Sequence, residues 1–146
     1  MELRKMFFMF VLVFLLVAPA AVVSAGDFDW TGNLNIRAES DPSGFRGRLA
    51  TRFKVGAVEI DAVLRNVESP ADAYLILRLG ELSARSTDYV IDQYRREKSK
   101  GWGALAKSLG IKPGSREFHA LKRGDDLYAD NGDGQKNGKG KGKGKK

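Results

Sequence analysis

The sequence predicts an all-α protein: a compact bundle of five or six short helices that includes a helix-turn-helix-like corner. Between Phe45 and Arg123, apolar residues recur at intervals of three and four, which is the spacing of a buried helix face. Serine and glycine residues stand where these helices are expected to begin and end. No segment alternates apolar and polar residues as a half-buried strand does.

Two amphipathic stripes begin the predicted helical domain. The first repeats every four residues and places arginines on the opposite face: Phe45, Leu49, Phe53. The second follows the i, i+3, i+4, i+7 pattern of one buried face: Ile60, Val63, Leu64, Val67. Each stripe predicts a short helix that lies against the rest of the bundle.

The segment from Ala71 to about Leu82 is expected to be the central helix. Ser69 is a suitable N-cap, Pro70 loses no hydrogen bond at the first helical position, and the charge of Asp72 favours the first turn. The segment is apolar on most sides, and a helix of that kind is usually surrounded by others.

Three further helices are predicted after the central one. Ser86 and Thr87 can cap a helix that ends near Gly101. The stripe from Trp102 to Leu109 is closed by Gly110, and Ser115 begins a last short helix with Phe118 and Leu121 on its apolar face.

Residues 1–25 are predicted to be a cleavable signal peptide. Arg4 and Lys5 precede an apolar run from Met6 to Val17, and small residues lead to a cleavage site before Gly26. The alternative is a retained anchor, but a spanning helix needs about 20 apolar residues, more than this run supplies before Pro19. We therefore expect an exported protein, periplasmic or secreted, with no transmembrane segment after cleavage.

The mature chain divides into three predicted parts: a polar N-terminal arm (26–44), the helical domain (45–123), and an acidic hinge followed by a disordered Gly/Lys tail (124–146). The arm is rich in turn-forming residues and is expected to be a short strand or an arm lying on the domain. Residues 131–146 contain six lysines and one aspartate, a net charge of +5, whereas residues 26–130 have a net charge of only +1. The high pI therefore belongs to the tail, which is too polar to order itself.

The residue inventory argues against an enzyme. The chain has no cysteine, and His119 is its only histidine, so thiol catalysis and the common zinc motifs are excluded. For His119, a structural role in packing or helix capping is favoured over catalysis. The carboxylates are not paired in a way that indicates acid–base chemistry. The stretch from Asp130 to Gly134 matches a calcium loop only in part, because Gly140 stands where the bidentate glutamate is needed. No catalytic residue, metal site or cofactor is predicted.

The tail is the first candidate binding region. Its lysines form a polycation that attracts phospholipid head groups, lipopolysaccharide or other polyanions; they are Lys136, Lys139, Lys141, Lys143, Lys145 and Lys146. A solubilising tail without a partner is the alternative. Candidate surface residues on the body are Lys98, Lys100, Trp102, Lys107, Lys112 and Arg116. For Trp102 the alternative is a core aromatic at the start of a buried stripe.

The segment Ala104–Leu121 predicts the helix-turn-helix-like corner. Residues 95–123 contain nine basic and two acidic side chains, so nucleic-acid binding with Lys112 and Arg116 near phosphates is an alternative function. A signal peptide would take the chain away from the chromosome, and two-helix corners also occur as simple packing units.

The segment from Pro70 to Leu121 resembles small secreted helical proteins of Gram-negative bacteria that have no established function. The similar stretches are Pro70–Tyr74, Leu77–Leu82, Gly101–Lys107 and Leu109–Ser115, together with Glu117, Phe118 and His119. The resemblance implies an exported helical domain and gives no activity. We expect a monomeric, non-catalytic binding or structural module whose tail contacts anionic envelope components.

Overall fold

The computed structural model describes residues 25–124 and 126–128, and all regular structure among them is helical. The elements in chain order are η1 (Ala25–Phe28), α2 (Trp30–Ser40), α3 (Pro42–Phe53), α4 (Ala57–Leu64), α5 (Pro70–Ser83), α6 (Thr87–Glu97), η2 (Lys98–Lys100), α7 (Trp102–Ser108) and α8 (Arg116–Arg123). The all-α prediction is confirmed, and six of these α-helices, α3 to α8, cover the predicted helical domain.

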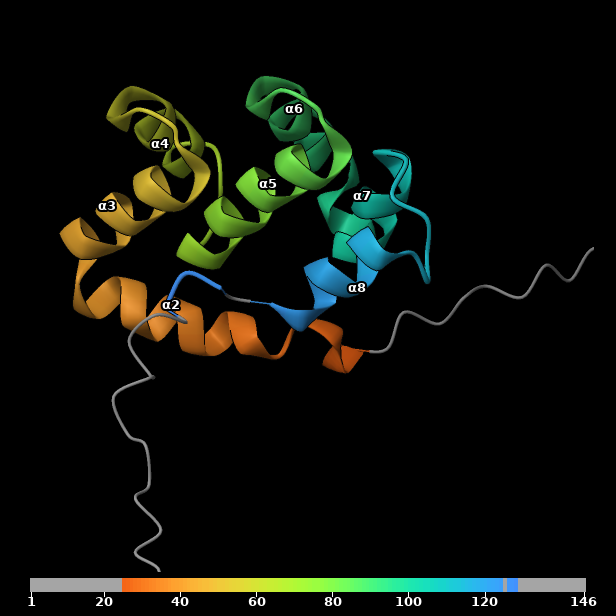
Figure 1. Ribbon diagram of the computed structural model, residues 1–146, viewed down its shortest axis with the longest axis horizontal. Helices are drawn as coiled ribbons and strands as arrows, with labels where there is room; N and C mark the ends of the chain where they lie inside the picture. The colour runs from red at the N-terminus through yellow and green to blue at the C-terminus, as the bar shows by residue number, and fades with distance from the viewer. Residues whose placement is uncertain (1–24, 125, 129–146) are drawn as a thin grey trace, which may run out of the picture.

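Helix α5 lies at the centre, with α3 and α4 on one side and α6, α7 and α8 on the other (Figure 1). It begins as the sequence predicts: Pro70 is in the first turn, and the Ser69 side chain accepts a hydrogen bond from the Asp72 N–H at 3.3 Å. Eight of its residues are buried: Ala71, Ala73, Tyr74, Leu75, Ile76, Leu77, Leu79 and Gly80.

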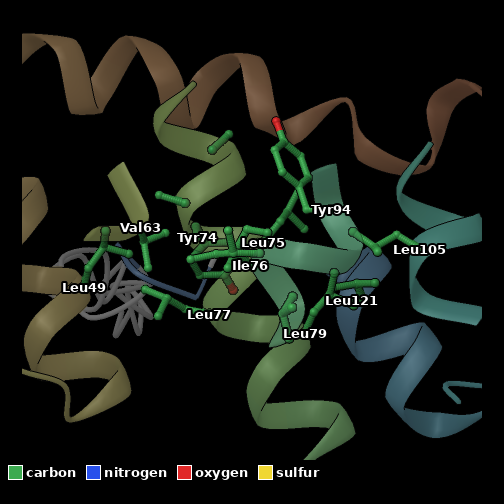
Figure 2. Packing of buried hydrophobic residues seen from close by; sticks show 14 of the residues in the cluster. Leu49, Val63, Tyr74, Leu75, Ile76, Leu77, Leu79, Tyr94, Leu105 and Leu121 are labelled. Carbon is green, nitrogen blue, oxygen red and sulfur yellow. The ribbon is translucent and has the colours of Figure 1, made fainter. Parts of the chain in front are cut away.

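The hydrophobic core forms around α5 on both sides. Leu49 of α3 and Val63 of α4 approach it from one side, and Leu105 of α7 and Leu121 of α8 from the other (Figure 2). Every buried side chain among the described residues is apolar or aromatic. A helix surrounded in this way is stabilised mainly by removal of apolar surface from water, at about 25 cal/mol per Å².

The prediction of a short strand or an arm for residues 26–44 is wrong, because residues 30–40 form helix α2. This helix lies across the ends of the others (Figure 1) and packs on α3 and α5. Trp30, Leu34 and Ala38 recur every four residues, and Leu34 and Ala38 are buried on one narrow face. Asn35 adds a polar contact, since its Oδ1 accepts a hydrogen bond from the Ala71 N–H at 2.7 Å. The helix therefore also caps the start of α5.

Part of the predicted acidic hinge also belongs to the folded body. Leu127 is buried, and Tyr128 packs against the core between Arg37 and Arg48, whose guanidinium carbons lie 5.1 and 4.9 Å from its ring centroid. The folded part thus begins before residue 45 and continues to residue 128. The predicted signal peptide, except Ala25, and the predicted Gly/Lys tail lie outside the described residues.

Within residues 25–124 and 126–128, no helix has the length and apolar content needed to cross a membrane.

Replacing Ala84 with glycine is expected to stabilise the protein. Ala84 ends α5 in the left-handed conformation, with φ of 53°, which is unfavourable for a residue with a Cβ atom. Ala84→Gly should raise the free energy of unfolding by about 1 kcal/mol, measured by urea denaturation. Ala62→Gly, within α4, is the matched control and should lower it by about 1 kcal/mol. A loss of stability in Ala84→Gly would contradict the assigned helix end.

Candidate functional site

A recess lies where the start of α5 meets the connection between α6 and α7. Its volume is about 260 Å³. Eight residues line it: Glu68, Asp72, Tyr94, Lys98, Ser99, Gly101, Trp102 and Leu105. The recess thus combines two aromatic rings, two carboxylates and one ammonium group, which is the mixture of apolar walls and few polar groups found in small-molecule sites.

Tyr94 and Trp102 form an aromatic pair in this recess. Their ring centroids are 5.4 Å apart and their planes differ by 23°, an offset stack. Tyr94 belongs to the last turn of α6 and Trp102 is the first residue of α7. Gly101, which joins η2 to α7 between the two rings, has a φ of 86°, a backbone conformation that strongly favours glycine.

The Tyr94 hydroxyl links this pair to α5. In Figure 2 the Tyr94 ring points away from the other labelled core residues, and its hydroxyl donates a hydrogen bond to Oδ2 of Asp72 at 3.0 Å. Burial raises the pKa of Tyr94 to about 12, and the hydrogen bond to Asp72 and its negative charge add to the shift. The phenol therefore remains a neutral donor at physiological pH.

Lys98 provides the ammonium group of the recess. Its Nζ forms an ion pair with Glu68 and lies 5.9 Å from the centroid of the Tyr94 ring, within cation–π range. The two side chains are 44% and 70% exposed, so solvent weakens their attraction.

The six candidate residues on the body do not form one site. Only Lys98 and Trp102 line the recess, and Trp102 is partly buried against the core. Lys100 instead pairs with Glu97 at 2.9 Å on the surface. The other three candidates lie elsewhere, with Lys107 exposed on α7, Lys112 in the connection to α8 and Arg116 in the first turn of α8.

Sequence reasoning missed Glu68, Asp72 and Tyr94 as site residues. Of these three, only Asp72 has a predicted role, in the first turn of the central helix. One local signal was available: Tyr94 and Lys98 are four residues apart and therefore project from the same side of consecutive turns. The two carboxylates gave no comparable signal, because their contact with Tyr94 and Lys98 depends on how α5 and α6 pack.

A second polar cluster joins the end of α5 to the C-terminal segment. Arg52 donates hydrogen bonds to Glu81 at 3.0 Å and to Asp126 at 2.8 Å, and Arg78 pairs with Glu81. The Tyr74 hydroxyl lies 2.9 Å from Oδ1 of Asp126. Burial alone would raise the pKa of Asp126, but hydrogen bonds from Arg52 and Tyr74 outweigh it and hold the pKa below its usual range.

No group of three or more His, Asp and Glu side chains among the described residues is arranged to hold a metal ion. His119 is exposed on α8. The structure therefore defines an all-α domain with a small polar and aromatic recess.

No family model matches the chain, and neither a curated protein nor a solved structure is significantly similar to it.

The Asp126 cluster predicts a pH-dependent contribution to stability. The pKa of Asp126 is lower in the folded protein than its ordinary value of 3.8, so ionised Asp126 stabilises the fold. This stabilisation is fully present at pH values above 3.8 and is lost as the pH falls from 3.8 to the pKa of Asp126 in the folded protein. Asp126→Asn should lower the free energy of unfolding at pH 7 by about 1 kcal/mol, and the difference from wild type should shrink below about pH 4.

Urea denaturation at pH 7, 5 and 3 measures this difference. Glu39→Gln, which removes an exposed carboxylate at the end of α2, is the control and should change stability little at any pH. An Asp126→Asn deficit that stays constant down to pH 3 would exclude the ionic explanation.

Proposed function

We propose that the protein is an exported, non-catalytic binding module whose Lys/Gly tail contacts anionic envelope material. The observation that supports this proposal most is the separation of charge along the chain. Residues 26–130 have a net charge of +1, whereas residues 131–146 have a net charge of +5. A nearly neutral body has little long-range attraction for a polyanion, so electrostatic binding would come from the tail.

The folded body also provides a fixed attachment point close to the tail. Asp126 is held by Arg52 and Tyr74, Leu127 is buried, and Tyr128 lies between two arginines. These contacts fasten the chain to α2, α3 and α5 just before the lysine-rich sequence begins. The body can therefore display the tail from one defined place without rearranging its own core.

A variant with glutamine in place of all six tail lysines tests this function. Each lysine near an anionic surface contributes about 1 kcal/mol, so we expect the variant to lose nearly all affinity for phosphatidylglycerol vesicles and lipopolysaccharide. Wild-type binding should weaken steeply as salt is raised. Co-sedimentation measures binding, and circular dichroism should show an unchanged helical body.

The matched control replaces four exposed body cations with glutamine: Lys100, Lys107, Lys112 and Arg116. This variant should retain most of the vesicle binding. Equal loss in both variants would contradict a specific role for the tail.

Export itself is tested by fractionating cells that contain the full-length protein and sequencing its N-terminus. Cleavage after Ala25 predicts an N-terminus at Gly26 and recovery outside the cytoplasm. The control is a variant with Val13→Arg, in which a charge interrupts the apolar run and should block export. Recovery of an uncleaved wild-type protein from the cytoplasm would contradict the proposal.

Nucleic-acid binding through α8 is the second candidate function. Arg116, His119 and Arg123 are exposed at i, i+3 and i+7, so they share the outer face of the helix. However, α7 packs mainly on α6 and η2, whereas α8 packs mainly on α5 and η1. The connection from Leu109 to Ser115 also exceeds the three or four residues usual in a DNA-binding helix-turn-helix. Duplex binding that survives in the glutamine-tail protein and weakens in Arg116→Ala would favour this candidate.

A further inference from the structure

The recess beside Trp102 has the size of a site for a small molecule or a single head group. Its volume of about 260 Å³ is just below the range of about 300–1,000 Å³ that holds drug-sized ligands. The buried side chain of Leu105 and the stacked rings of Tyr94 and Trp102 provide its apolar walls. These walls are supplied by packed helices, so the recess exists without a ligand.

The charge of the recess favours a cation. Two carboxylates, Glu68 and Asp72, line it, and Lys98 is the one cationic residue of the lining. Its surroundings are therefore negative although the whole chain has a net charge of +7. Only Oδ2 of Asp72 is used by Tyr94, which leaves a second carboxylate oxygen to accept hydrogen bonds. With Lys98 included, two negative charges and one positive charge line the recess, which favours a cation over an anion.

Lys98 shows how an ammonium group is held in this recess. Its Nζ has the two contacts that a bound organic cation would use: a carboxylate, from Glu68, and the ring of Tyr94. The pair is exposed, so little free energy opposes its replacement by an ammonium group from a ligand. A flexible lysine side chain can swing into solvent when that happens.

We propose that this recess binds a small organic cation through its ammonium group, and that Lys98 occupies the ammonium position when no ligand is bound. Glu68 and Asp72 neutralise the ligand charge, and the rings of Tyr94 and Trp102 contact its methyl or methylene groups. This site is separate from the tail and does not depend on the proposed contact with anionic material.

Calorimetric titration of the full chain with choline, and separately with ethanolamine, tests the proposal, and acetate is the anionic control. We expect the cations to bind and acetate not to bind. Glu68→Gln should weaken binding about fivefold, and Trp102→Leu about tenfold. Lys98→Gln should strengthen binding about threefold, because it removes the competing ammonium group.

Two variants make the same charge changes away from the recess. Glu39→Gln is the control for Glu68→Gln, and Lys107→Gln is the control for Lys98→Gln; all four side chains are exposed, so these substitutions preserve the fold. The controls should leave affinity unchanged. Absence of cation binding, equal binding of acetate, or a Lys98→Gln variant that binds no better than wild type would overturn the proposal.

A further arm identifies the source of the ammonium group. The glutamine-tail protein is mixed with phosphatidylcholine vesicles, so that the tail lysines contribute nothing. If the protein is retained on these vesicles and the Glu68→Gln substitution abolishes the retention, the ligand is a lipid head group. If the protein binds free choline but not the vesicles, the ligand is a soluble cation. Both outcomes support the ammonium site, and neither depends on whether the tail binds polyanions.

Discussion

The burial of Tyr74 in the middle of α5 is the constraint on which the rest of the structure depends. Its ring is enclosed by Trp30 and Phe53, whose centroids lie 5.5 and 5.6 Å away. A buried hydroxyl without a hydrogen-bond partner costs about 1–3 kcal/mol. The partners are Asp126 and the carbonyl oxygen of Gly124, at 2.9 and 3.1 Å. An apolar central helix thus requires a polar segment from the far end of the chain to close over it.

The two polar clusters of the body both lie near the ends of α5. Its carboxylates lie toward its two ends, Asp72 in the first turn and Glu81 in the last, and Arg78 between them points to the Glu81 end, where the two side chains form an ion pair. At the first end, Asp72 meets the aromatic pair of the recess. At the other end, Glu81 meets Arg52 and the C-terminal segment. The recess and a structural ion cluster therefore lie at opposite ends of the same buried helix.

The parts of the fold that local sequence determines were predictable. Ser69 and Pro70 set the start of α5, and the Ser86 and Ser115 side chains accept hydrogen bonds from the Tyr89 and Phe118 N–H groups, as their predicted capping roles require. Helix α2 was missed because its buried face comprises only Trp30, Leu34 and Ala38 in a polar segment. Its helical state depends on packing against α5, which composition does not show.

The candidate site was predictable only in part, for a related reason. Lys98 and Trp102 are close in sequence and stand out beside Gly101, but Asp72 precedes Tyr94 by 22 residues and joins it only through helix packing. Arg52 and Asp126 are 74 residues apart, and nothing local to either indicates their ion pair. Contacts of this length follow from the whole arrangement of helices.

The position of Gly124 has a consequence for the order in which the chain folds. Its backbone lies directly against the Trp30 indole, where an added Cβ atom would come within 2.5 Å of the ring. The first α-helix, α2, is therefore covered by a residue that follows the last helix, α8. A growing chain therefore cannot complete its core until Leu127 has left the ribosome. Until then the Trp30 and Tyr74 rings lack the C-terminal segment that closes over them in the folded protein.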